Sequence, residues 1–370
     1  MKVLLDLRPL ETPSARRGIG RYARELAMAL PAAAPGGWRF VGLSWSGEGA
    51  RLGLEDLRYP GPRRGIGLAD RFIVPRLLRR AGVDLYHSTA YALPGRGARG
   101  VALVLTIHDL VADLHPEALS LRHRLAFGRT FRSASAADRV LTISETTRRE
   151  LLARYPVEPR RVVAVPIGVA GAFRSGGEAA GISSGLPRPF IFYVGGLDRL
   201  KNVPFLLEVL RRLRGEEAEM RLVVAGEEGR RLEALRSAVR EAGLADCVAT
   251  IGYIGDARLA AIYREAAAFV FPSRYEGFGL PPLEAMAAGC PVVSSRGGAL
   301  EEVLGDAALI VDPEDAAGWA RAIGRLIRDA GTRSRQIDAG LARVAGLTWE
   351  RTARATAGVY MDALRERRRE

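Results

Sequence analysis

The sequence predicts an α/β protein of two domains, each built on a parallel sheet that helices cover on both faces. The chain has 370 residues, which is too long for one ordinary core and suits two domains of roughly 150–200 residues each. Short β-branched runs alternate with helical stretches of ten or more residues, a pattern typical of parallel sheets. Residues 171–187, rich in Gly, Ser and Ala, separate two series of such runs and are expected to form a linker.

The expected strands fall into two groups. The first group comprises residues 3–7, 39–43, 84–87, 102–107, 140–143 and 162–165. The second comprises residues 190–194, 221–225, 249–252, 268–271, 291–294 and 309–311. Residues 349–368 have apolar positions at helical spacing and predict a closing helix. The expected domains are therefore residues 1–170 and 188–345, with residues 346–370 packing back towards the first domain.

Composition excludes several classes of protein. Hydrophobic residues make up 48% and charged residues 26% of the chain, which excludes a disordered protein. The two cysteines, Cys247 and Cys290, cannot build a disulfide framework and suit a reducing compartment. Asp6 and Arg8 interrupt the first apolar run too early for a signal peptide, and no run of eighteen apolar residues occurs. A cytoplasmic protein is expected, with a peripheral position at the inner face of the membrane as an option.

The net charge of +13 comes with 53 arginines and only two lysines, Lys2 and Lys201. A basic excess can indicate nucleic acid, a membrane surface or an anionic small molecule as partner. Replacement of lysine by arginine on solvated faces explains most of it more simply. A lysine in such a chain therefore indicates a position that needs lysine and not arginine.

Lys201 lies in the loop after the first strand of the second group, close to Gly195 and Gly196. Apolar residues at helical spacing follow it, and Asn202 is the expected N-cap of that helix. A flexible ammonium beside unpaired backbone N–H groups is suited to holding phosphate. The alternative is a solvent-facing lysine in a turn.

A second loop, after the expected strand 268–271, contains Glu276, Gly277 and Gly279 and leads to a helix that includes Glu284. Glycines allow backbone amides to approach a ligand closely. The two carboxylates lie near one strand end, where they can accept sugar hydroxyls. The alternative pairs a helix-dipole glutamate with a solvated turn glutamate. Gly289 is the expected C-terminal cap of the helix.

Two histidines end strands of the first group, where ligands bind in open α/β sheets. His108 is the stronger candidate to hydrogen-bond a sugar hydroxyl, and His87 is the second. Alternatively, Asp109 satisfies a buried His108 imidazole. Ser144 is expected to be an N-cap.

Neither dinucleotide binding nor a metal site is expected. The stretch GIGRYA begins some ten residues after the first strand, whereas the glycines of a dinucleotide fingerprint follow the strand at once. No Asp-x-Asp pair and no His/Cys/carboxylate cluster with ligand spacing occurs in the sequence. No cofactor is expected.

Several segments together carry a resemblance to a known family. Glu276 and Glu284 enclose seven residues in EGFGLPPLEAMAAGCPVV, which resembles the E-x7-E motif of retaining GT-B glycosyltransferases of glycosyltransferase family 4. The loop VGGLDRLKN resembles that family's diphosphate-binding segment. The stretches GIGRYARELAMAL, LTIHDL, TISETTRREL and VPIGV complete the pattern in the family's order, over nearly the whole chain.

The resemblance implies two Rossmann-like domains facing a central cleft, with the sugar nucleotide bound mainly by the second and the acceptor mainly by the first. It implies that Lys201 neutralises the diphosphate, Glu284 accepts the ribose hydroxyls and Glu276 holds the donor sugar. It also implies retention of the anomeric configuration by front-face attack. Further contacts are implied for the amides of Phe278, Gly279 and Leu280, for a glycine-rich loop of Gly18, Ile19 and Gly20, and for His108 beside the transferred sugar.

One position departs from the family pattern. Many members carry an arginine where this chain has Gly196, and Arg199 is a candidate to replace its charge. Tyr253 and Ile254, beyond another strand end, are expected to flank the nucleotide base. The Lys-Asn ending of the diphosphate loop and GIGRY resemble the mannosyl- and rhamnosyltransferase branches, which favours GDP-mannose as donor.

The leading prediction is a metal-independent, retaining glycosyltransferase that moves a hexose to a glycan, lipid-linked or small-molecule hydroxyl. One alternative is a sugar-nucleotide epimerase or a phosphorylase on the same scaffold. A non-catalytic basic surface-binding protein is a remote alternative, and no nucleic-acid module is visible. Residues 71–80 and 122–132 interleave arginine with apolar residues, so they could also seat the enzyme on an anionic membrane.

Overall fold

The chain divides into two compact units, which are described separately. The computed structural model describes residues 1–63, 66–94, 100–174, 183–226 and 228–367. The first unit comprises Met1–Gly168 together with Thr348–Glu370, and the second comprises Val169–Leu347. Each unit contains one sheet in which all described strand pairs are parallel.

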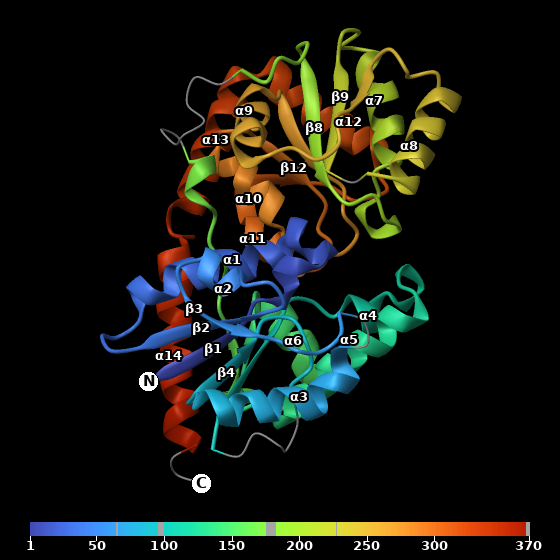
Figure 1. Ribbon diagram of the computed structural model, residues 1–370. Helices are drawn as coiled ribbons and strands as arrows, with labels where there is room; N and C mark the ends of the chain where they lie inside the picture. The colour runs from blue at the N-terminus through green and yellow to red at the C-terminus, as the bar shows by residue number, and fades with distance from the viewer. Residues whose placement is uncertain (64–65, 95–99, 175–182, 227, 368–370) are drawn as a thin grey trace. The chain divides into compact units, whose positions relative to one another are not determined.

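The sheet of the first unit has seven strands in the order β3-β2-β1-β4-β5-β6-β7 among the described residues (Figure 1). The strands are β1 (Lys2–Asp6), β2 (Arg39–Ser44), β3 (Glu55–Arg58), β4 (Leu85–Ser88), β5 (Ala102–Ile107), β6 (Arg139–Thr142) and β7 (Val162–Ala164). The expected strands agree with these except for β3, which the sequence analysis missed. Its sequence EDLR has no buried residue, because it is a polar edge strand with one neighbour.

Helices cover both faces of this sheet. The helices are α1 (Gly18–Ala33), α2 (Glu48–Arg51), α3 (Ile66–Ala81), α4 (Val111–Leu114), α5 (Leu121–Ser133), α6 (Glu145–Arg154) and the C-terminal α14 (Trp349–Arg367). The inward residues of α3, α5 and α6 pack with alternate residues of β5, namely Leu103, Leu105 and Ile107, in one hydrophobic cluster. Since alternate residues of a strand share a face, these helices cover the same face. Helix α14 packs against α1 and also contacts β5 and β6.

The second unit has a six-stranded sheet in the order β10-β9-β8-β11-β12-β13 among the described residues. The strands are β8 (Phe190–Gly195), β9 (Arg221–Gly226), β10 (Val248–Thr250), β11 (Ala268–Phe271), β12 (Val292–Ser294) and β13 (Ala308–Ile310). The helices are α7 (Phe205–Arg214), α8 (Arg230–Glu241), α9 (Asp256–Glu265), α10 (Leu280–Ala287), α11 (Leu300–Leu304), α12 (Ala316–Arg328) and α13 (Ala330–Ala345). Figure 1 shows α7, α8 and α12 on one side of this sheet and α9, α10 and α13 on the other.

The expected linker, residues 171–187, differs from a free spacer in the part that the structure describes. Gly171–Phe173 form a short 3-10 helix, and the Phe173 ring is fully buried against Tyr263, with ring centroids 6.0 Å apart. Ser184 is also buried, and its backbone N–H donates to Glu265. These residues pack onto the second unit because a phenylalanine in a Gly- and Ser-rich segment still gains by leaving water. Residues 175–182 of the expected linker lie outside the described residues.

Candidate active site

The strand order of the second sheet creates a topological switch point between β8 and β11. From β8 the chain proceeds to β9 and β10 on one side, and from β11 it proceeds to β12 and β13 on the other. The loops that leave β8 and β11 therefore diverge at the carboxyl edge of the sheet. In open α/β sheets this crevice is where ligands bind. The loops after β8 and β11 are the two loops that contain Lys201 and Glu276, which the sequence analysis singled out.

The loop after β8 folds into a short 3-10 helix, Arg199–Lys201, whose start is capped by the Asp198 carboxylate accepting from the Leu200 N–H at 3.2 Å. The expectation that Asn202 caps the next helix is wrong. Asn202 adopts a left-handed backbone with φ of 55°, and its side-chain amide donates to the Pro313 carbonyl at 3.0 Å. Helix α7 begins only at Phe205. The Asn202 side chain thus anchors the loop to the segment after β13.

Lys201 and Glu276 meet at the switch point. The Lys201 Nζ lies 2.6 Å from Glu276 Oε1, and the two side chains are 25% and 15% exposed. Ser273 Oγ also donates to the same oxygen at 2.7 Å. The ammonium and carboxylate therefore neutralise each other in a partly shielded position that solvent can still reach. Ser273 was not identified from the sequence, although its place at the end of β11 is the signal that could have found it.

The backbone around Glu276 is held from three sides. The Arg274 N–H donates to the Leu200 carbonyl at 2.6 Å, which ties the loop after β11 to the loop after β8. The Ala299 N–H donates to the Glu276 carbonyl at 2.8 Å. A Cβ on Gly298 would lie 2.3 Å from that same carbonyl oxygen, and Gly298 has φ of 64°, so only glycine fits. The loop after β12 thus locks Glu276 in place.

Glu284 lies on α10, which leaves the same strand as Glu276. It is 4% exposed, and Tyr263 Oη donates to Glu284 Oε2 at 3.4 Å. Gly289 follows the helix with φ of 76° and its N–H donates to the Met286 carbonyl, so the expected glycine cap is confirmed. A carboxylate kept this far from water needs polar partners. Tyr263, on α9, is a partner that no sequence pattern indicated.

The start of α10 presents backbone donors. Gly279 is its N-cap, with φ of 94°, and Leu280 is its first residue. Pro281 and Pro282 follow and have no N–H, so the donors at this helix end are concentrated on Gly279 and Leu280. Phe278, just before them, is buried, with 5% of its surface exposed. This arrangement suits an anion placed at the helix N-terminus.

The remaining second-unit candidates lie around the same edge. Arg199 is exposed, and Gly196 is partly exposed with its carbonyl accepting from Tyr193 Oη at 2.6 Å. Tyr253 is 49% exposed and Ile254 is 9% exposed, in the loop after β10. Strand β10 is two strands from β8, a separation of about 10 Å. That spacing is compatible with a ligand that reaches from Lys201 to Tyr253.

In the first unit, the expected glycine-rich loop of Gly18, Ile19 and Gly20 is instead the first turn of α1. The helix extends back to Gly18 because its buried stripe, including Tyr22 and Leu26, continues the helical spacing. A Cβ on Gly20 would lie 2.5 Å from the Ser14 carbonyl oxygen, so this glycine allows the helix to pack on the preceding turn. The N–H groups of a helix start therefore stand where the resemblance implied a glycine-rich loop.

His108 follows β5 and is held in one orientation. Its Nε2 donates to the Thr89 carbonyl at 2.8 Å, and its ring packs edge-on to Tyr22 with centroids 4.9 Å apart. Burial lowers the pKa of His108 to about 4, so the ring is neutral at pH 7. With the proton on Nε2, Nδ1 is the acceptor. The nearby Asp109 precedes α4 and accepts from the Val111 N–H at 3.0 Å.

His87, the second histidine candidate, has a structural role. It is fully buried, with Nδ1 2.6 Å from Tyr360 Oη and Nε2 2.7 Å from Thr106 Oγ1. The Thr106 hydroxyl is in turn 2.9 Å from Tyr22 Oη. Burial lowers the pKa of His87 to about 3. This chain of hydrogen bonds joins α14 and α1 to the sheet. Ser144 is confirmed as an N-cap, accepting from the Thr147 N–H at 3.0 Å.

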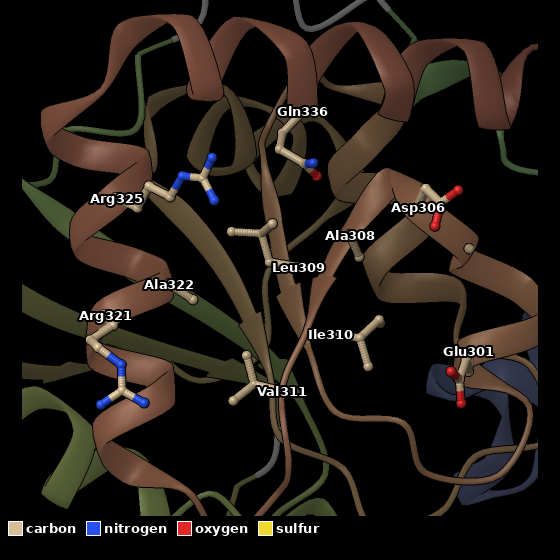
Figure 2. Close-up of a pocket in the computed structure, with 11 residues that line it drawn as sticks. Glu301, Asp306, Ala308, Leu309, Ile310, Val311, Arg321, Ala322, Arg325 and Gln336 are labelled. Carbon is tan, nitrogen blue, oxygen red and sulfur yellow. The ribbon is translucent and has the colours of Figure 1, made fainter.

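A pocket of 630 Å³ lies away from these residues, along the edge strand β13 (Figure 2). Figure 2 shows Arg321 and Arg325 of α12 on one side and Glu301 and Asp306 on the other. None of the candidate site residues lines it. The candidate site therefore lies at the switch point and not in this pocket.

The described residues contain no group of three or more His, Cys, Asp or Glu side chains that could hold a metal ion. Among the helices in the described part of the chain, none combines the length and apolar character that a membrane crossing needs.

Two units with parallel sheets, the second with a lysine and two glutamates near its switch point, are typical of a glycosyltransferase with the GT-B fold. Residues 16–170 match the family described as Glycosyltransferase Family 4, and residues 182–343 match Glycosyl transferases group 1. The chain belongs to this glycosyltransferase family. The resemblance drawn from the sequence motifs is therefore confirmed.

Two curated relatives illustrate its similarity. The D-inositol 3-phosphate glycosyltransferase of Acidothermus cellulolyticus is 36% identical over 309 residues, which cover 77% of this chain and 68% of the relative. The O-antigen chain mannosyltransferase B of Escherichia coli is 30% identical over 287 residues, covering 75% of this chain and 74% of the relative. Among solved structures, sucrose-phosphate synthase from Thermosynechococcus elongatus superposes with a TM-score of 0.79 over 98% of both chains, at 24% identity. That last likeness concerns the fold alone.

Proposed function

We propose that this glycosyltransferase moves mannose from GDP-mannose to an acceptor hydroxyl, with retention of configuration and without a metal ion. The observation that carries the proposal is the Lys201–Glu276 pair at the switch point, 2.6 Å apart and partly open to solvent. The ammonium is suited to the diphosphate and the carboxylate to hydroxyls of the sugar that the diphosphate carries. A relative named as a mannosyltransferase and the Lys-Asn ending of the loop support mannose.

The diphosphate would be held by two kinds of donor from neighbouring loops. Lys201 offers a cation, and the Gly279 and Leu280 N–H groups lie at the start of α10. Both stabilise the negative charge that grows on the leaving GDP as the bond to the sugar breaks. Arg199, exposed in the same loop, is proposed to supply the charge that Gly196 lacks.

The carboxylates of Glu276 and Glu284 would accept hydrogen bonds from different hydroxyls of the donor. Glu284, buried on α10, is proposed to accept from the ribose, and Glu276 from the mannose. They come from one βα unit and so serve one face of the ligand, which argues against acid and nucleophile on opposite sides of a glycosidic bond. For the base, Tyr253 and Ile254 are proposed as flanking residues.

The acceptor oxygen forms a bond to the anomeric carbon on the face from which GDP leaves, and the bond from that carbon to the phosphate oxygen breaks. The proton of the acceptor hydroxyl passes to a phosphate oxygen of the leaving GDP. From the first unit, the neutral His108 is proposed to accept a hydroxyl of the transferred sugar through Nδ1, and the α1 start at Gly18–Gly20 to contribute N–H groups to the diphosphate.

The test is an assay of the purified chain with GDP-mannose, UDP-glucose, UDP-N-acetylglucosamine and ADP-glucose. Acceptors include oligomannosides, a lipid-linked saccharide and inositol 3-phosphate, the last because of the relatives' names. Nuclear magnetic resonance of the product reads the anomeric configuration, and dialysis against EDTA tests metal independence. Inversion, or transfer only from UDP- or ADP-sugars, would overturn the finer proposal. A sugar nucleotide isomerised without acceptor would favour the epimerase alternative.

A further inference from the structure

Large apolar side chains on the surface are concentrated in one part of the first unit. Among the described residues, the exposed large hydrophobic side chains are Met28, Phe72, Leu121, Leu125 and Tyr253. Three of these five belong to α3 and α5. Single exposed apolar residues are ordinary, whereas a group on adjacent elements marks an interaction surface.

Helix α5 has two contrasting faces. Phe131 and Thr130 are buried, and Phe127 packs partly buried on the core cluster. Leu121 and Leu125, one helical turn apart, are 67% and 57% exposed. By the 100° rotation per residue, Arg122, Arg129 and Arg132 lie on the same outward side as the two leucines. The helix therefore presents an apolar ridge bordered by arginines, although its core contacts are already made by the opposite face.

Helix α3 repeats this arrangement. Val74 and Leu78 are fully buried in the cluster that also contains Phe131 of α5. Phe72 is 61% exposed. The exposed arginines of α3 are Arg71, Arg76, Arg79 and Arg80. Since α3 and α5 cover the same face of the sheet, their outward sides both point away from that face (Figure 1).

The charge on these two helices has one sign. Together they contain eight arginines and a single acid, Asp70. Asp70 is buried and engaged by Arg8 at 2.7 Å, so it does not offset the outward charge. The acids between β5 and α5 are Asp109, which accepts from the Val111 N–H at 3.0 Å, Asp113, which accepts from Tyr155 Oη at 2.6 Å, and Glu117, which lies 3.4 Å from His115. The outward surface of α3 and α5 is thus strongly basic as well as partly apolar.

We propose that this surface, made of the outward sides of α3 and α5, docks the first unit on an anionic lipid bilayer. Guanidinium groups match lipid phosphates in charge and geometry, and leucine and phenylalanine side chains match the acyl boundary just below them. A helix with this composition lies in the plane of the interface. A nucleic acid would use the charge but would leave Leu121 and Leu125 without a partner. The proposal is independent of the donor and acceptor proposed above.

The test measures binding of the full chain to vesicles by co-sedimentation. Vesicles contain phosphatidylcholine alone or with about a third of phosphatidylglycerol, at low and at high salt. We expect binding to the anionic vesicles only, weakened by salt. The triple variant Arg122→Gln, Arg129→Gln, Arg132→Gln should bind roughly a hundredfold more weakly, because each basic residue near such a surface contributes several-fold.

Two further variants separate charge from insertion. Leu121→Ser with Leu125→Ser keeps every charge and should still lower anionic-vesicle binding at least tenfold, since the buried apolar area is lost. The matched control, Arg230→Gln with Arg231→Gln and Arg240→Gln on α8, removes three exposed arginines of the second unit and should bind like the wild type. Circular dichroism and unfolding midpoints verify that all variants fold. Absence of wild-type binding at low salt overturns the proposal, as does equal weakening in the α8 control. Undiminished binding of the leucine variant also overturns it and indicates a polyanion surface instead.

Discussion

Replacing Lys201 with methionine removes the ammonium that contacts Glu276 and that is proposed to contact the donor diphosphate. In the structure its Nζ contacts Glu276 at 2.6 Å. A bound diphosphate would compete with Glu276 for the same charge. The two variants Lys201→Met and Glu276→Gln should therefore change the affinity for GDP in different ways.

The expected magnitude follows from the contacts. A hydrogen bond to a charged group contributes about 1.5–3 kcal/mol, so Lys201→Met should weaken GDP binding about 10- to 150-fold. Glu276→Gln removes the competitor without removing the ammonium, so GDP should bind at least as tightly as in the wild type. Folding should change little in either variant, by about 1 kcal/mol or less, because the pair is partly solvated.

The assay is isothermal titration calorimetry with GDP alone, followed by transfer from GDP-mannose under saturating acceptor. Both variants should lose transfer, Lys201→Met through the diphosphate and Glu276→Gln through the sugar. Arg211→Gln, an exposed position on the neighbouring α7, has the same charge change and serves as the control. The reasoning is refuted if Lys201→Met binds GDP with unchanged affinity, or if Glu276→Gln binds it as poorly as Lys201→Met.

The remaining predictions concern binding, stability and pH. Glu284→Ala should lower transfer roughly a hundredfold, because hydrogen bonds to a charged group are lost. In this variant a 2′,3′-dideoxy donor should be transferred no more slowly than the normal donor. If the dideoxy donor is still transferred much more slowly, the proposed ribose contact is contradicted. Arg8→Met leaves the buried carboxylates of Asp6 and Asp70 without their cation and should lower the free energy of unfolding of the first unit by about 3–5 kcal/mol. Urea unfolding measures this change, and a wild-type unfolding midpoint would count against it. Because burial lowers the pKa values of His87 and His108 to about 3 and about 4, the unfolded chain binds protons that the folded chain does not. Stability should therefore be fully present above pH 6.5 and fall as the pH drops from 6.5 towards 4, with a slope of up to about 2.7 kcal/mol per pH unit from the two groups; a flat profile in chemical denaturation over this range would contradict it. Transfer should persist after EDTA dialysis, and activity restored only by added Mg²⁺ or Mn²⁺ would show the opposite.

Much of the fold was accessible from the sequence because parallel strands are buried on both faces. Such strands appear as short apolar runs, and every expected run coincides with a strand in the structure to within two residues. Edge strand β3 escaped because its residues, EDLR, bury nothing fully and carry no apolar pattern. The same limit explains Gly18–Gly20, where glycines suggested a loop but the buried stripe of α1 extended the helix through them.

The identity of the candidate site residues could also be predicted from the sequence, but their contacts with one another could not. Strand-end positions and the retained Lys201 identify the two loops that lie at the switch point. The sequence does not show that Lys201 and Glu276 are paired 2.6 Å apart, nor that Ser273 supports that pair. Such contacts join residues separated by up to 75 positions, so they depend on how the strands are ordered in the sheet.

What the sequence by itself determined is the two-unit α/β plan and the family-typical residues, since both are written in local periodicity and short motifs. Only the tertiary structure decided which polar groups form hydrogen bonds inside the protein and so cannot contact a ligand. His87 looked like a strand-end ligand, yet Tyr360, 273 residues away, occupies its Nδ1. Only the tertiary structure likewise decided that Phe131 faces the core while Leu121 and Leu125 face outward. The physical reason is that a side chain's environment depends on neighbours that the chain brings in from afar, which local sequence does not encode.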